Sequence, residues 1–260
     1  MLRPETRRGR IVDLLRAGAP VSVDTLAAAL AASRETVRRD LADLARQGLV
    51  RRFHGGAALP EPVGEGAFLI RLAEHPREKR AIGRRAAALF GPGDTLFVDT
   101  GTTSVVFAEE LARRAGLTVV TNCLTIAQLV GGSGNGNRSF MIGGEYRDAA
   151  AQTLGPLAVE QIARFHAAHA VLTVGAIDPV GVMDFDLAET EVARAMIAQA
   201  VTVTVIADSS KLGRRGLFEV CTLARVDRLV IDRPADRVLA PALQAAGIEV
   251  IVAEPQATPD

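Results

Sequence analysis

The sequence contains few cysteines and no long apolar run. Its two cysteines, Cys123 and Cys221, are far apart and belong to no Cys-x-x-Cys motif or Cys/His cluster. That pattern argues against a disulfide framework and a structural zinc site. No apolar run approaches the roughly 18 residues that a membrane-spanning helix needs. Residues 1–10 contain arginines with no apolar stretch behind them, unlike a secretory signal peptide. We therefore expect a cytoplasmic protein with no membrane segment, no metal and no cofactor.

Net charge is absent as well, because 30 Lys and Arg balance 30 Asp and Glu. This balance hides an asymmetry along the chain. Residues 1–60 hold 11 Arg and 6 acidic residues, a net charge of +5, so residues 61–260 carry a net charge of −5. Hydrophobic residues make up 48% of the chain, enough to fill a core and to exclude disorder. A basic N-terminal part on an acidic remainder indicates a polyanion-binding module joined to a second domain.

Residues 1–58 have the pattern of three short helices followed by a β-hairpin. The third helix is the most distinct, since Ser33 is a good N-cap and Val37, Leu41 and Leu44 form an apolar face. A strand-like stretch then leads into a His-Gly-Gly turn. Together these features predict a winged helix-turn-helix domain whose third helix enters the major groove of DNA.

Polar residues lie opposite that apolar face and on the hairpin. Arg can donate two hydrogen bonds to a guanine edge, Thr can contact a thymine methyl group, and Arg on a wing suits phosphates. The alternative is a solvated helix face with ordinary arginines, but the capping, the spacing, the hairpin and the local positive charge favour DNA binding. The predicted DNA-binding residues are Ser33, Arg34, Thr36, Arg38, Arg39, Arg51, Arg52 and His54.

The remainder divides into a linker and an α/β domain. Residues 59–75 are the expected linker, in which residues 59–66 contain two Pro and two Gly and show no periodicity, so we expect an extended arm there. In residues 76–253 short apolar stretches alternate with amphipathic helices, which predicts a mostly parallel sheet covered on both faces. The expected strands are 95–98, 118–121, 140–142, 171–174, 201–207, 228–231 and 249–252.

Small polar residues follow several of these strands, where ligands bind to such sheets. The first strand leads through residues 99–104, Asp-Thr-Gly-Thr-Thr-Ser, into a helix whose N-terminus suits an anion. Lys211, one of only two lysines, follows the fifth strand. Hydroxyls, glycines, one Lys and one Arg suit a small polyol that carries a phosphate. The predicted effector-binding residues are Asp99, Gly101, Thr102, Thr103, Ser104, Thr121, Asn122, Gly144, Arg147, Gly175, Asp208 and Lys211.

Other interpretations of these polar residues stay open. The 99–104 loop is neither a Walker A loop nor a dinucleotide fingerprint, and it also fits an ordinary turn between strand and helix. Arg214 and Arg215 fit a solvated surface better than a ligand site. His166 and His169 stand three residues apart in a predicted helix, but no third ligand is near, so we expect surface histidines rather than a metal site.

The motifs resemble a known family. Residues 33–41, Ser-Arg-Glu-Thr-Val-Arg-Arg-Asp-Leu, followed by Arg-Phe-His-Gly-Gly-Ala at 52–57, resemble the DeoR family of bacterial transcriptional regulators. The Asp-x-Gly-Thr-Thr, Thr-Asn, Gly-Gly and Asp-x-Ser-Lys motifs occur in the order of that family's effector domain. That domain is similar to pentose-phosphate isomerases and binds sugar phosphates. The resemblance covers nearly the whole chain.

Two segments, 54–60 and 183–187, are similar to the branch of the family that contains the glycerol-3-phosphate regulon repressor. One departure is Ile-Asp-Pro at 177–179, where many relatives have Asp-Gly, so Asp178 is assigned no contact. The resemblance implies a repressor of a carbohydrate or polyol catabolic operon that binds operator DNA as a homodimer or homotetramer. A phosphorylated sugar or polyol would release it, with glycerol 3-phosphate as the first guess.

An enzyme is the competing interpretation, namely a sugar-phosphate isomerase with a DNA-binding head. An isomerase needs a general base close to a carbon-bound proton. Asp99, Glu145, Asp178 and Asp208 are nominal candidates, but no paired-carboxylate motif stands out. We therefore expect a sensor without turnover. Whether it represses or activates depends on operator position, which the sequence leaves open.

Overall fold

The computed structural model describes residues 4–16, 21–46, 50–53, 55–58 and 68–254. Contacts divide the chain into two compact units, Met1–Val63 and Gly64–Asp260. Among the described residues, no helix is long and apolar enough to cross a membrane.

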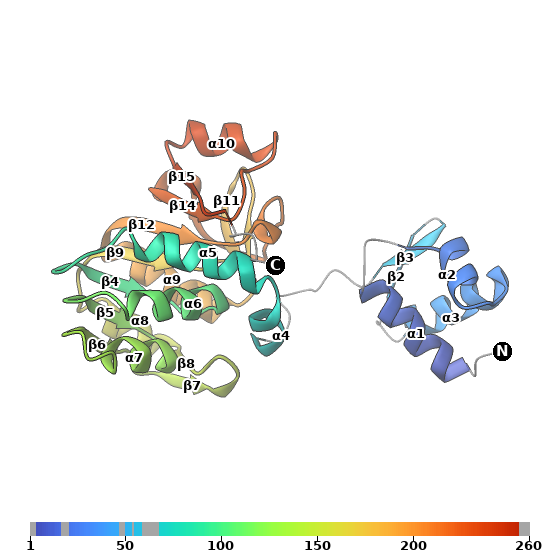
Figure 1. Ribbon diagram of the computed structural model, residues 1–260, viewed down its shortest axis with the longest axis horizontal. Helices are drawn as coiled ribbons and strands as arrows, with labels where there is room; N and C mark the ends of the chain where they lie inside the picture. The colour runs from blue at the N-terminus through green and yellow to red at the C-terminus, as the bar shows by residue number, and fades with distance from the viewer. Residues whose placement is uncertain (1–3, 17–20, 47–49, 54, 59–67, 255–260) are drawn as a thin grey trace, which may run out of the picture. The chain divides into compact units, whose positions relative to one another are not determined.

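The first unit is a three-helix domain with a small sheet, which confirms the predicted winged helix-turn-helix (Figure 1). Its strands are in the order β1-β3-β2, so a third strand, β1, joins the expected hairpin. A core of fully buried side chains, including Ile11, Leu26 and Val37, holds the three helices together. The elements are α1 (Pro4–Arg16), β1 (Val21–Ser22), α2 (Val23–Ala29), α3 (Arg34–Arg46), β2 (Arg51–Phe53) and β3 (Gly56–Ala58).

The second unit is built on a seven-stranded sheet in which every neighbouring pair is parallel, as predicted. The strand order is β15-β14-β12-β9-β4-β5-β6. Four of the seven strands have the predicted bounds, and the others shift by one to four residues. The strands are β4 (Thr95–Val98), β5 (Thr118–Thr121), β6 (Arg138–Met141), β9 (Ala167–Leu172), β12 (Ala200–Ile206), β14 (Arg228–Ile231) and β15 (Glu249–Val252).

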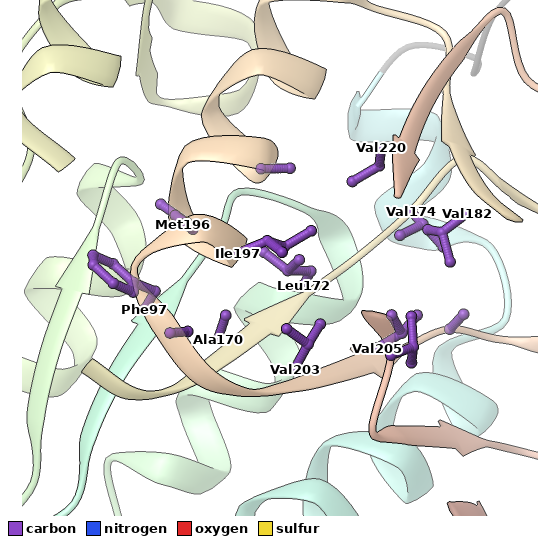
Figure 2. Packing of buried hydrophobic residues seen from close by; sticks show 14 of the residues in the cluster. Phe97, Ala170, Leu172, Val174, Val182, Met196, Ile197, Val203, Val205 and Val220 are labelled. Atoms are coloured by element: carbon purple, nitrogen blue, oxygen red, sulfur yellow. The ribbon is translucent and has the colours of Figure 1, made fainter. Parts of the chain in front are cut away.

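Helices cover both faces of this sheet because its side chains alternate between two cores. Phe97 belongs to one core, whereas its neighbours Leu96 and Val98 belong to the other. Figure 2 shows the first core, where Met196 and Ile197 of α9 lie over β9. Helices α8 (Pro156–Ile162), α9 (Leu187–Ala198) and α10 (Leu239–Ala245) pack on that face, and α5 (Pro76–Ala87), α6 (Thr102–Leu111) and α7 (Leu124–Gly131) pack on the other.

Two antiparallel additions had no counterpart in the sequence analysis. One is a three-stranded sheet of β10 (Ala176–Ile177), β11 (Gly181–Asp184) and β13 (Phe218–Thr222). The other is a hairpin of β7 (Glu145–Arg147) and β8 (Gln152–Leu154). Strands of two to five residues are too short to show a clear alternation of apolar and polar residues.

The predicted linker, residues 59–75, contains a helix that the sequence analysis did not expect. Phe68–Ala73 form α4. This helix packs against α6 and against η1 (Asp148–Ala150). Six residues are too few to form a stable helix alone, so packing against α6 and η1 stabilises α4. Residues 59–67 lie outside the described residues.

The expectation that His166 and His169 share a helix is wrong. His169 lies on β9, with its Nε2 3.8 Å from Asp94 Oδ1 and its ring against Phe90. Burial lowers the pKa of His169. The alanines of residues 167–172 fit a helix, but hydrogen-bonded pairing with β4 and β12 makes this segment a central strand.

Candidate functional site

Helix α3, the predicted DNA-reading helix, begins with a side-chain cap. Ser33 Oγ accepts a hydrogen bond from Thr36 N at 3.1 Å and lies 2.8 Å from Thr36 Oγ1. This reciprocal contact satisfies one of the N–H groups that a helix start leaves without a partner. Ser33 and Thr36 are thus explained by helix capping as well as by the predicted contact with DNA.

Among the α3 side chains that the structure describes, three arginines are exposed. Arg34 Nε lies 2.6 Å from Asp24 Oδ1, and Arg39 Nε lies 3.5 Å from Glu35 Oε1. Both ion pairs are largely solvated, so they hold the guanidinium groups weakly. Arg38 is exposed between them. The helix therefore presents solvent-exposed cations on the surface opposite its buried Val37 and Leu41.

The wing is described only in part. Arg51 and Arg52 lie on β2, and Arg52 pairs in register with Ala57 of β3. Their side chains and the whole of His54 lie outside the described residues. The backbone accordingly places two predicted phosphate contacts on an antiparallel pair of strands beside α3.

A pocket lies at the carboxyl end of the parallel sheet. It encloses about 440 Å³, counting space open to solvent. Four of the predicted effector residues line it, namely Gly101, Thr102, Thr103 and Lys211. The other lining residues are Phe68, Arg71, Thr100, Ala150, Thr173, Val174, Asp184, Glu189, Ile206 and Ala207.

The floor of the pocket is the N-terminus of α6. Gly101 precedes this helix, and a Cβ atom at this position would lie 1.9 Å from Thr173 Oγ1. Only glycine therefore lets the loop pass this close to Thr173. Thr102 and Thr103 occupy the first turn, where backbone N–H groups lack helical acceptors and the helix dipole favours an anion.

Asp99 lies beneath this floor instead of lining the pocket. Its Oδ1 accepts hydrogen bonds from Thr173 N at 3.0 Å and from Ser104 Oγ at 2.9 Å. Burial raises the pKa of Asp99 well above its usual range, and the nearby charges of Asp184 and Glu189 add to that rise. Asp99 and the fully buried Ser104 thus fix the loop that forms the floor.

Lys211 and Arg71 supply the positive charge. Lys211 belongs to the short helix η2 (Ser209–Lys211), whose N-cap, Asp208, accepts a hydrogen bond from Ser210 N at 3.0 Å. Arg71 lies on α4, and its backbone carbonyl accepts a hydrogen bond from Lys79 Nζ. Burial lowers the pKa of Lys79, which lies within electrostatic range of Lys211. Both lysines of the chain are therefore at this end of the sheet.

Two of the predicted effector residues support the pocket from behind it. Asn122 Oδ1 accepts a hydrogen bond from Thr100 Oγ1 at 3.1 Å, and its Nδ2 donates to Thr153 O at 3.0 Å. Thr121 Oγ1 accepts a hydrogen bond from Cys123 N. Both side chains are buried, and the hydrogen bond with Thr100 joins Asn122 to a residue that lines the pocket.

The remaining three predicted residues do not line the pocket. Arg147 is exposed, and its Nη1 donates to Asp186 Oδ2 at 2.8 Å. A Cβ atom at Gly144 would lie 2.6 Å from Leu154 O, and one at Gly175 would lie 2.7 Å from the ring of Phe185. These two glycines permit close packing of the chain, which is a structural role.

Sequence reasoning did not assign five polar lining residues, namely Thr100 within the 99–104 loop and Arg71, Thr173, Asp184 and Glu189 outside it. Arg71 fell within the predicted linker. Thr173 follows β9, but the expected strand covered residues 171–174 and so included Thr173. Asp184 lies in the 183–187 segment that resembles one branch of the family, but it was given no role there. Glu189 is in the first turn of α9. The resemblance of residues 183–187 was the one signal in the sequence that pointed toward this side of the pocket.

Comparison with known proteins agrees with this arrangement. The pattern described as "DeoR-like helix-turn-helix domain" matches residues 7–63, and the "DeoR C terminal sensor domain" matches residues 74–233. The glycerol-3-phosphate regulon repressor of Escherichia coli (strain K12) is 32% identical over 234 residues, which are 90% of this chain and 92% of that protein. The HTH-type transcriptional repressor CsqR of the same organism is 33% identical over 253 residues, 96% of each chain.

Among solved structures, ribose 5-phosphate isomerase A from Methanocaldococcus jannaschii aligns with 52% of this chain and 53% of its own, with a TM-score of 0.38 and 14% identity. The sensor-domain match alone spans more than half of the chain, and the two repressors match it over nine-tenths or more. The chain therefore belongs to the DeoR family of transcriptional regulators.

Proposed function

We propose that this protein is a DNA-binding repressor of a carbohydrate or polyol catabolic operon, released from its operator by a phosphorylated sugar or polyol. The observation that carries the proposal is the pocket, in which Lys211, Arg71 and the N-terminus of α6 converge. Close relatives are named as repressors, including the glycerol-3-phosphate regulon repressor, and this supports the same role for the chain.

The DNA interface consists of α3 and the wing. Arg38 and Arg39 contact base edges in the major groove, with Arg34, Ser33 and Thr36 at the start of the helix. The solvated ion pairs of Arg34 and Arg39 are weak enough to exchange for DNA contacts. Arg51, Arg52 and His54 of the wing contact phosphates. The operator half-sites are engaged by a homodimer or homotetramer, since paired heads gain affinity from binding together.

The effector phosphate occupies the floor of the pocket. Backbone N–H groups of Thr102 and Thr103 donate to its oxygens, and Lys211 and Arg71 balance its charge. The hydroxyls of Thr100 and Thr173 lie around the same space and suit the hydroxyls of a polyol. Glycerol 3-phosphate is the first candidate, because relatives that align with 90% and 88% of the chain carry its name.

Helix α4 connects the two functions. It lines the effector pocket with Phe68 and Arg71, and in the chain it directly follows residues 59–67, which lead from the DNA-binding unit. An effector bound to Arg71 therefore changes the stability of α4. The effector lowers operator affinity only if it binds the DNA-free arrangement better, and the coupling is reciprocal.

Operator release tests the proposal directly. The full-length protein on an operator fragment is titrated with glycerol 3-phosphate, a hexose 6-phosphate, a tetritol phosphate and inorganic phosphate. One of the organic phosphates is expected to release the complex while inorganic phosphate does not. If none releases it at millimolar concentration, the proposed effector class is wrong. Light scattering that shows a monomer bound one-to-one to the operator would contradict the oligomer.

The isomerase alternative is tested with the same ligands. Asp184 and Glu189 place two carboxylates in the pocket, the type of group that a proton-transfer enzyme uses. A sensor binds a phosphosugar without converting it. A coupled aldose–ketose assay on the full-length protein is therefore expected to give no turnover above that of a Lys211→Ala variant.

A further inference from the structure

The effector pocket carries two kinds of charge. Its lining contains the cations Arg71 and Lys211 and the carboxylates Asp184 and Glu189. The cations come from α4 and η2, whereas the carboxylates come from the end of β11 and the first turn of α9. The function proposed above uses the cations for the phosphate and leaves the two carboxylates without a role.

The local structure holds both carboxylates in place. Glu189 Oε1 accepts a hydrogen bond from Gln152 Nε2 at 2.6 Å, and Asp184 Oδ1 accepts one from Phe185 N at 2.6 Å. Their charges act on the same buried neighbour, because both raise the pKa of Asp99 under the floor. The buried cation Lys79, by contrast, lies within electrostatic range of Asp208 and Glu74 as well as of Lys211 and Arg71.

An ionised carboxylate only accepts hydrogen bonds. Hydroxyl groups of a polyol can donate to it, whereas a carboxylate or second phosphate on the ligand would bring like charges together in a partly desolvated site. Positively charged lining residues alone would favour the ligand with more negative charge. The carboxylates reverse that preference for the part of the ligand that extends beyond its phosphate.

We propose that Asp184 and Glu189 determine specificity, so that the pocket takes a ligand with one phosphate and an uncharged, hydroxyl-bearing tail and rejects phosphorylated sugar acids and bisphosphates. This inference rests on the proposed function, in which the pocket binds a phosphorylated effector. It adds which members of that class bind, and it places the selection in the segment from β11 to α9.

Matched ligand pairs test the inference by calorimetry on the full-length protein. Glycerol 3-phosphate and 3-phosphoglycerate differ at one end, where CH₂OH is replaced by a carboxylate. Glucitol 6-phosphate and 6-phosphogluconate differ in the same way in a longer chain. For the pair whose polyol binds, the sugar acid is expected to bind at least tenfold more weakly. Equal affinity, or tighter binding of the acid, would overturn the inference.

Variants locate the selection. Glu189→Gln and Asp184→Asn remove one charge each with little change in shape, and the amide oxygen introduced by Glu189→Gln can still accept the hydrogen bond from Gln152. Each is expected to reduce the ratio of polyol to acid affinity at least threefold. The control is Glu191→Gln, two residues further along α9, where the exposed carboxylate pairs with Arg194 at 2.7 Å. Its ratio should equal that of the wild type.

The outcomes separate this inference from the function beneath it. If polyol phosphates release the operator but the ratio is the same in wild type, Glu189→Gln and Glu191→Gln, the selection is not made by the carboxylates and the repressor function stands. If no ligand of either pair binds or releases the operator, the proposed effector class fails together with the inference. Should Asp184→Asn fail to fold, the wild-type ratio and Glu189→Gln decide the matter.

Discussion

Asp40 of α3 accepts two hydrogen bonds from the guanidinium of Arg7 on α1, at 2.5 Å from Nε and 3.2 Å from Nη2. Both side chains are almost fully buried, and Arg8 Nε adds a third contact to the same carboxylate at 3.2 Å. The Asp of the Thr-x-Arg-Arg-Asp-Leu motif therefore points into the domain while the two arginines before it point outward. This ion pair fixes the rotation of the recognition helix.

Replacing Asp40 with Asn is expected to destabilise the DNA-binding unit by about 3–5 kcal/mol, because the buried Arg7 then loses the carboxylate charge of Asp40. Hydrogen exchange of the α1 and α3 amides in the full-length protein measures the change. The control is Asp24→Asn, which removes an exposed ion pair with Arg34 and should cost less than about 1 kcal/mol. Equal losses in the two variants would show that the Arg7–Asp40 pair contributes no more than a surface pair.

Arg38→Ala tests the major-groove contact. Loss of a guanidinium that bonds a base edge should cost roughly 1–3 kcal/mol in operator affinity and relax the preference for sequence. Because Arg38 is exposed, the variant should unfold at the wild-type temperature. Fluorescence anisotropy with operator and random DNA measures both affinities. The assignment is wrong if the two DNAs lose the same free energy of binding.

Arg51→Ala and Arg52→Ala test the wing. Phosphate contacts carry no sequence information, so each variant should weaken operator and random DNA alike. Each should also reduce the slope of log affinity against log salt concentration by about one unit, since one counterion fewer is released. An unchanged slope would place that side chain away from the phosphates.

Lys211→Ala and Thr102→Val test the effector site. Loss of a charged hydrogen bond to the phosphate should lower effector affinity by about 1.5–3 kcal/mol for Lys211, while operator affinity without effector changes little. The result would be a repressor that stays on its operator. The matched control is Arg214→Ala, because Arg214 lies over the ring of Phe185 and does not line the pocket. Release of Lys211→Ala at the wild-type effector concentration would contradict the phosphate assignment.

Asp99→Asn tests the buried carboxyl group. The pKa of Asp99 is raised in the folded protein, so the native state binds its proton more tightly than the unfolded chain. This contribution is complete below about pH 4 and is lost as the pH rises through the raised native value. The amide oxygen of the substituted side chain can keep both accepted hydrogen bonds, so the variant should be more stable than wild type at neutral pH. Denaturant titrations of both proteins from acid to neutral pH measure this difference. If the free energy of unfolding depends on pH in the same way in wild type and variant, Asp99 does not bind a proton in this pH range.

The strands of the main sheet could be predicted from the sequence because each is a short apolar run with turn residues on either side. Thr95–Val98 and Arg228–Ile231 have these properties. Short runs that are almost wholly apolar are typical of strands buried on both faces of a parallel sheet. Ala167–Leu172 was misplaced, because its alanines fit a helix as well as a strand. Local sequence does not distinguish the two, and pairing with both neighbours decides the outcome.

The pocket was predictable only where it depends on one strand and the loop after it. Gly101, Thr102 and Thr103 follow β4 directly, so the local order of residues predicted an anion site at the start of α6. Arg147 and Gly144 also follow a strand, but β6 is at the edge of the sheet and its loop continues into the β7–β8 hairpin instead. Gly175, after the central strand β9, packs against Phe185 and does not line the pocket either, so position after a strand is not sufficient by itself.

The sequence alone determined the family, the two kinds of domain and the floor of the effector site, since each depends on residues that are close together in the chain. Only the tertiary structure brought Arg71, Asp184 and Glu189 to the same pocket, from a helix in the predicted linker and from a segment more than a hundred residues later. Side chains so far apart meet because helix and sheet packing buries their apolar neighbours. No local pattern records that packing, which is why the charges that select the ligand emerged only from the fold.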